Sequence, residues 1–294
     1  MSPSGRAKGE FRRARPEGAR ASRRAATVAL LALLAGCAGS PSSTPAAPSP
    51  ASTPPPAAGR DLTTASDQTD ADRRARVRLE LANAYFERGQ LDTALDEVKL
   101  ALAVKPDLGD ALLLRALIYA AMGEARLAED SFGRALQVNP ADGAAMNAYG
   151  WYLCQNKRYA DAEAMFQQAL AQPNYRDAKR TQHARGVCLS REGRWADAEG
   201  ALMRAYELDA GNPEIGFNLA EVLYQRRDYE RARFYIGRVN DTEGAVNAQT
   251  LWLAARIANR LGDSVARDRL GQQLATRFPQ SREAQQFARG QFDG

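Results

Sequence analysis

Three cysteines and one histidine are the side chains with the most evident chemical potential in this 294-residue chain. Thiolates and imidazoles bind metals or act as nucleophiles and bases when several of them converge. Cys154 and Cys188 are not in a Cys-x-x-Cys spacing, and His183 has no second histidine with which to share a metal. The chain contains no phosphate-binding glycine motif and no nucleophile elbow. We therefore expect a protein that is not an enzyme, with no catalytic residue, metal, cofactor or small-molecule substrate.

The remaining cysteine follows an N-terminal pattern typical of export. Residues 1–24 contain eight Arg or Lys, and residues 25–36 read AATVALLALLAG. An apolar run of this length is too short for a spanning helix, which needs about 20 residues. A basic segment, a short apolar run and small residues at its end predict a secretory signal peptide over residues 1–36.

Cys37 has a more specific context. Leu34, Ala35, Gly36 and Cys37 resemble the lipobox of bacterial lipoproteins, which implies cleavage before Cys37 and lipidation of its sulfur. Because Ala38 stands where Asp would favour inner-membrane retention, we expect an anchor at the periplasmic face of the outer membrane. The alternative is a plain signal peptide with a cysteine near the cleavage point by chance.

The segment after Cys37 is rich in Pro, Ala, Ser and Thr and has no large apolar side chain until Leu62. Such a composition cannot form a core, so residues 37–66 are predicted to be a disordered tether. Removing residues 1–36 leaves 32 basic and 33 acidic residues, a net charge of −1 instead of +5. The basic character belongs to the leader, and we expect no nucleic-acid partner.

The rest of the chain repeats with a period of 34 residues. Matching residues in the first two units are Ala82 and Ala116, Tyr85 and Tyr119, Gly89 and Gly123, Ala94 and Ala128, Ala101 and Ala135, and Pro106 and Pro140. The pattern continues through units of about 75–108, 109–142, 143–178, 179–212, 213–246 and 247–281. Small residues would let two helices of a unit cross closely, and the prolines would end units.

These positions resemble the tetratricopeptide repeat. The resemblance implies an all-α fold over residues 67–289, a right-handed superhelical solenoid of about six helix-turn-helix pairs whose concave face holds another polypeptide. Exposed apolar side chains on such a face usually mark a partner site. The predicted partner-binding groove consists of Leu79, Asn83, Phe86, Leu113, Leu117, Trp151, Phe217 and Tyr224. The alternative is that these residues only pack the interior of the solenoid or lie under the tether.

Export and repetition together suggest a role for the two later cysteines. They occupy places in consecutive units that differ by about 200° of helical rotation, so they leave opposite faces of adjacent parallel helices and can meet. We predict a disulfide between Cys154 and Cys188, worth about 3–4 kcal/mol from loop-closure entropy. Two buried reduced cysteines, serving as small apolar residues, are the alternative.

The lipobox, the tether, six repeats and segments such as NAYGWYLCQNKRYADAEAMFQQAL and GVCLSREGRWADAEGALMRA are similar to the type IV pilus biogenesis lipoproteins, the secretin pilotins of the PilF/PilW type. This resemblance implies a protein that binds the pilus secretin subunit and promotes its outer-membrane localisation and multimer assembly. The alternative is another repeat-bearing envelope lipoprotein, acting in barrel-protein assembly or peptidoglycan synthesis.

Overall fold

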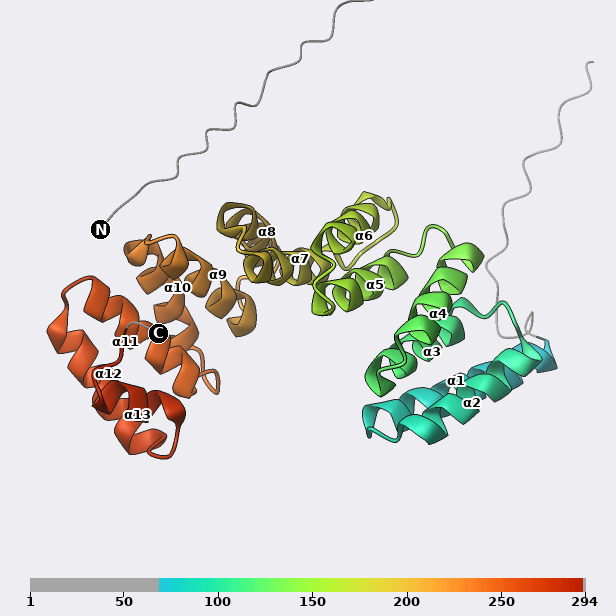
Figure 1. Cartoon of the computed structure of the whole chain (residues 1–294), viewed down its shortest axis with the longest axis horizontal. Helices are drawn as coiled ribbons and strands as arrows, with labels where there is room; N and C mark the ends of the chain where they lie inside the picture. The colour runs from blue at the N-terminus through green and yellow to red at the C-terminus, as the bar shows by residue number, and fades with distance from the viewer. Residues whose placement is uncertain (1–68, 293–294) are drawn as a thin grey trace, which may run out of the picture. The chain divides into compact units, whose positions relative to one another are not determined.

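The computed structural model describes residues 69–292, and every regular element within them is an α-helix (Figure 1). The helices are α1 (Asp70–Glu87), α2 (Leu91–Val104), α3 (Gly109–Met122), α4 (Ala125–Val138), α5 (Gly143–Gln155), α6 (Tyr159–Ala171), α7 (Ala178–Glu192), α8 (Trp195–Leu208), α9 (Pro213–Gln225), α10 (Tyr229–Asp241), α11 (Ala248–Arg260), α12 (Ser264–Arg277) and α13 (Arg282–Ala288). The predicted all-α fold of repeated helix pairs is confirmed. None of these helices is long and apolar enough to cross a membrane.

Three sequence-based predictions fall on other parts of the chain. The signal peptide 1–36 and the tether 37–66 lie outside the described residues. The lipidated Cys37 lies outside them too, so its modification stays a prediction.

Each unit pairs a first helix with the second helix that follows it, from α1 with α2 to α11 with α12. The two helices of a unit can cross closely only where the residues at the crossing have small side chains or none. A Cβ on Gly150 of α5 would lie 2.9 Å from the Phe166 ring of α6 and 3.2 Å from the Ala162 carbonyl oxygen. A Cβ on Gly186 of α7 would lie 2.5 Å from Leu202 of α8. These glycines therefore set the distance between the helices of units three and four.

The turn between the two helices of a unit needs a residue in the left-handed backbone conformation, with positive φ. Gly123 and Gly193 supply it with φ of 81° and 84°. In units three and five the same role falls to Lys157 and Arg227, with φ of 61° and 65°. A side chain in this region is strained, so these turns are held by the helices they connect.

Apolar side chains form three clusters along the chain instead of one central core. One lies in α1–α3, a second extends from α3 to α7, and a third extends from α7 to α11. Each cluster contains side chains from neighbouring units, as expected when a repeat buries its apolar face only against the next repeat.

The C-terminal helix α13 covers the last pair. It contacts both α11 and α12, and its Phe287 lies over Gly271 of α12, where no Cβ could be accommodated. Phe292 stacks on Trp252 of α11 with ring centroids 5.5 Å apart. The terminal segment therefore shields apolar surface that a further repeat would otherwise cover.

Candidate functional site

The predicted groove residues of the first unit lie beside the first apolar cluster. Leu79 and Phe86 are half-buried and pack against the α1–α3 core. Asn83 is exposed, and its Nδ2 donates to the Leu79 carbonyl oxygen at 3.0 Å. This bond uses one of the two N–H donors of the amide, so the exposed Asn83 keeps a second donor and its Oδ1 acceptor for a partner.

The predicted residues of units two and three belong to the central cluster. Leu113, Leu117 and Trp151 are half-buried and pack against the core that includes Cys154 and Cys188. Trp151 is also covered on one ring face, because the Arg191 guanidinium lies 4.8 Å from the ring centroid. Such an arrangement is a cation–π contact and holds the indole in place while leaving part of it open.

The two predicted residues of the fifth unit differ from each other. Phe217 is half-buried against the third apolar cluster. Tyr224 is only 5 % exposed. Arg256 lies 4.4 Å from its ring centroid and Arg260 Nε donates to its hydroxyl at 3.4 Å. The prediction that Tyr224 offers open groove surface is wrong, because the following unit covers the ring.

A pocket of about 780 Å³ lies along the later first helices. Its walls come mainly from α5, α7 and α9, and from the residues just before α9. The lining residues are Asn147, Ala148, Trp151, Asp177, Lys179, Arg180, His183, Ala184, Val187, Arg191, Asp209, Asn212, Glu214, Ile215 and Asn218. Among the predicted groove residues, Trp151 alone lines this pocket.

A polar pair lies in this pocket. His183 Nε2 and Asn218 Nδ2 are 2.7 Å apart, which joins α7 to α9. Burial lowers the pKa of His183 below its ordinary 6.5, and the charge of Glu214 acts in the opposite direction. The imidazole is therefore neutral at pH 7 and accepts a hydrogen bond from the amide. Within residues 69–292, no group of three His, Cys, Asp or Glu is placed to hold a metal.

The pocket continues into a second hollow of about 340 Å³. The two share Val187, Arg191 and Asn218, and the second adds Glu221 of α9. Desolvation raises the pKa of Glu221, and the Arg256 charge opposes this rise. The two hollows together offer apolar, amide and charged groups. An extended polypeptide could contact these groups with its side chains and its backbone.

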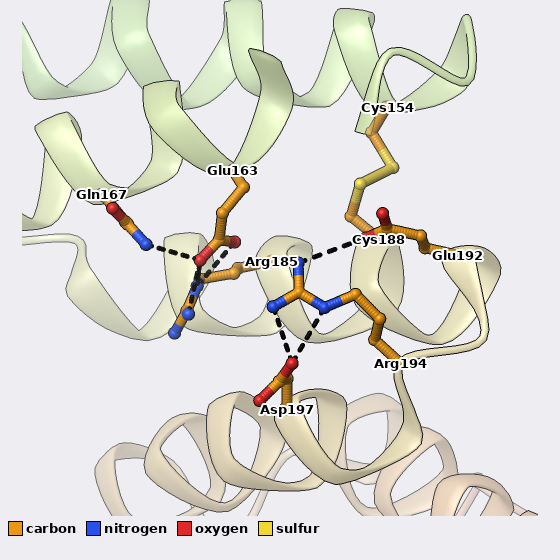
Figure 2. A network of polar contacts seen from close by, with 8 residues as sticks. All are labelled: Cys154, Glu163, Gln167, Arg185, Cys188, Glu192, Arg194 and Asp197. Atoms are coloured by element: carbon orange, nitrogen blue, oxygen red, sulfur yellow. Dashed lines mark hydrogen bonds and ion pairs between the residues drawn. A yellow bond between two sulfur atoms is a disulfide. The ribbon is translucent and has the colours of Figure 1, made fainter. Parts of the chain in front are cut away.

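The junction between units three and four positions these walls (Figure 2). Cys154 of α5 and Cys188 of α7 form a disulfide in the structure, with Cα atoms 5.8 Å apart. The two sulfurs meet because the cysteines lie on facing sides of adjacent first helices, as the spacing predicted. The disulfide fixes α5 against α7 within the cluster that supports Trp151.

An ion pair lies beside this disulfide (Figure 2). Arg185 Nη2 donates to Glu163 Oε1 at 2.6 Å, and Gln167 Nε2 donates to the same oxygen at 2.7 Å. The first two side chains are 18 % and 15 % exposed. Burial alone would raise the pKa of Glu163, but the hydrogen bonds from Arg185 and Gln167 outweigh it and hold that pKa below its usual value. Units three and four are thus joined by a covalent and an ionic contact.

The groove predicted from the sequence and this pocket lie largely in different units of the chain. Five of the eight predicted groove residues, Leu79, Asn83, Phe86, Leu113 and Leu117, lie in units one and two, whereas the pocket of about 780 Å³ lies in units three to five. Asn147 and His183 occupy the same inward-facing place in their units as Leu79, Leu113 and Phe217. Arg180 and Glu214 occupy a second inward-facing place from which no residue was selected. The signal that identifies them is this position in the repeat, and apart from Asn83 the selection favoured apolar side chains.

Comparison with known proteins agrees with this architecture. The tetratricopeptide-repeat family matches residues 113–179 and residues 189–251. The type IV pilus assembly protein PilF of Pseudomonas aeruginosa is 28 % identical over 209 residues, which cover 71 % of this chain and 82 % of PilF.

Solved structures give the same result. The structure of Pseudomonas aeruginosa PilF aligns with a TM-score of 0.67 and 26 % identity over 76 % of this chain and all of that one. The crystal structure of PilW, a widely conserved type IV pilus biogenesis factor, aligns with a TM-score of 0.68 and 28 % identity over 73 % of this chain and 98 % of that one. The chain is therefore a tetratricopeptide-repeat protein homologous to PilF and similar in structure to PilW.

Proposed function

We propose that the protein is an outer-membrane lipoprotein that binds the type IV pilus secretin and promotes its localisation and multimer assembly at the outer membrane. The observation that supports this most strongly is the similarity to PilF, which extends over 71 % of the chain rather than over a single repeat. The lipobox at Cys37 supports the membrane anchor.

The groove formed by α5, α7 and α9 is the proposed contact for a secretin segment. Trp151 and Val187 would receive apolar side chains, and the amides of Asn147 and Asn218 would face the bound backbone. The disulfide and the Arg185–Glu163 pair hold the walls before binding. A preformed groove lowers the ordering cost of association.

The proposed mechanism is non-covalent. Anchoring through Cys37 would confine the repeats to the membrane surface. A secretin subunit held by the groove would then be concentrated where its ring must form, which favours assembly without any new contact between secretin subunits.

Co-purification from detergent-solubilised outer membrane is the test. Tagged wild-type protein should retain the secretin, and Trp151→Ala and Asn218→Ala should retain much less. Leu127→Ala is the matched control, because Leu127 is an exposed apolar residue of α4 that does not line the groove. Absence of secretin from the wild-type sample would refute the proposed partner.

Gene deletion separates this function from the alternative. Loss of secretin multimers and of twitching motility supports the pilus role. Intact secretin rings with general envelope defects would instead indicate a role in barrel assembly or peptidoglycan synthesis. Cys37→Ser should leave the protein soluble in the periplasm and the secretin displaced from the outer membrane.

A further inference from the structure

An acidic residue recurs at one position of the second helices. In α4, α6 and α8 an alanine buried at the helix crossing is followed directly by glutamate. Each of these glutamates pairs with an arginine of the next unit: Glu129 with Arg158 at 2.8 Å, Glu163 with Arg185 at 2.6 Å, and Glu199 with Arg231 at 2.7 Å and also with Arg226. The carboxylate thus bridges one unit to the next on the side of the second helices.

The fifth unit breaks this rule. The buried Ala232 of α10 is followed by Arg233, so a cation stands where three preceding units have a carboxylate. Arg233 lines an open pocket of about 450 Å³ between α10, α11 and α12, helices that neighbour one another in Figure 1. The floor of this pocket is apolar and includes Ile236, Leu251 and Leu270.

The charges around this pocket, which we name the α10–α12 pocket, are mostly positive. Arg233, Arg269 and Arg277 are the cationic lining residues, and Asp241 and Asp263 are the acidic ones. The Asp263 side chain is already engaged, because it caps α12 by accepting from the Ala266 backbone N–H at 2.9 Å.

The arginines are weakly held. Arg233 pairs with Glu230 at 2.6 Å, but both side chains are more than half exposed, and such surface pairs contribute little to stability. Arg277 lies 5.6 Å from the Phe278 ring centroid. Arg269 forms no ion pair within residues 69–292. The guanidinium groups can therefore reorient toward an incoming carboxylate at little cost.

One further lining residue needs a hydrogen-bond donor. Asn240 Oδ1 is buried and has no hydrogen-bond partner within the described part of the chain. A buried acceptor without a donor destabilises the folded protein, and a ligand N–H that reached Asn240 would recover part of this cost. A peptide backbone carries N–H donors along its length and could supply one to Asn240.

We propose that the α10–α12 pocket is a docking site for an acidic, extended peptide segment of another protein. A ligand carboxylate would lie between Arg233 and Arg269 and would supply the negative charge that Glu129, Glu163 and Glu199 supply in units two to four. A neighbouring apolar side chain would occupy the floor formed by Ile236 and Leu270, and a backbone N–H would serve Asn240. None of these residues lines the groove of α5, α7 and α9, so the site is independent of the proposed secretin contact.

Fluorescence anisotropy on the purified repeat-bearing protein tests this site. The probe is a short fluorescein-labelled peptide in which leucines are flanked by glutamates. Arg233→Glu and Arg269→Glu should each weaken binding about tenfold, the size expected for reversing one ion-pairing charge. Arg233→Glu should also fold normally, because it introduces the residue type that units two to four have at this position. Arg204→Glu is the control, since Arg204 is an exposed arginine of α8 outside the pocket.

The outcomes are distinct. Weaker binding for the two pocket variants and unchanged binding for the control, with unaltered circular dichroism melts, supports the proposal. No binding of the probe, equal losses in the control, or equal affinity for a peptide with lysine in place of glutamate overturns it. Binding of phosphatidylglycerol vesicles that needs Arg233 and Arg269, without peptide binding, would overturn the choice of a peptide ligand.

Discussion

Removing the disulfide should weaken the middle of the solenoid more than its ends. The perturbation is Cys154→Ala combined with Cys188→Ala. The bond closes a loop of 34 residues, for which loop-closure entropy predicts a loss of about 3–4 kcal/mol in unfolding free energy. For a folded body of this size, 1 kcal/mol corresponds to roughly 2–4 °C, so the melting temperature should fall by about 6–16 °C.

Circular dichroism melts with and without a phosphine reductant would measure this effect. Reduction should lower the melting temperature of the wild-type protein to about that of the double variant. The reductant should not change the melting temperature of the double variant. Hydrogen exchange would locate the effect, because units in a solenoid contact only their neighbours. Faster exchange should concentrate in α5–α8 and leave α11 and α12 unchanged.

Two results would refute this reasoning. Recovery of both Cys154 and Cys188 as free thiols from freshly isolated protein, by mass spectrometry of non-reduced peptides, would remove its premise. Identical melts of wild-type and double-variant protein under oxidising conditions would show that the native helices, and not the closed loop, determine stability in this region.

Three further predictions concern other parts of the chain. The hydrogen bond from Lys105 lowers the pKa of Asp72 from 3.8 to about 2. The stabilisation from this ion pair should therefore persist above pH 3.8 and disappear as the pH falls through 2, and carboxyl NMR titration should give that low midpoint. Gly271→Ala should cost about 1–3 kcal/mol by displacing Phe287. Hydrogen exchange should then show α13 loosened and α7 unaffected. The single histidine, His183, should titrate below 6.5 in the folded protein and near 6.5 in urea, because burial disfavours the imidazolium. Since the folded state then binds fewer protons, unfolding free energy should fall as the pH drops below 6.5.

Period and residue size were enough to predict the helix pairs. Ala82, Ala94 and Ala128 recur at fixed spacing because two helices can cross closely only over small side chains, and all three are fully buried. Gly150 and Gly186 follow the same requirement. The spacing of these small residues recurs along the chain, so it can be recognised in a single sequence.

The groove was harder to predict because it depends on contacts between units. Tyr224 has the expected inward place, yet Arg256 and Arg260 of the next unit cover it. Arg185 is a largely buried arginine, and the group that neutralises its charge is Glu163 of the preceding helix. Helix α13 has no repeat pattern, and its position follows from Phe287 packing over Gly271. Such long-range pairings cannot be read from periodicity.

The bond between Cys154 and Cys188 also determines how the protein would carry tension. A pull applied along the chain would pass from α5 directly to α7, and α6 would lie outside the path of force. Stretching an oxidised molecule would release about 110–120 Å less contour length than stretching a reduced one, because the 34 residues of the closed loop could not extend. An optical trap would therefore measure different unfolded lengths for the oxidised and the reduced protein, although their amino-acid sequence is the same.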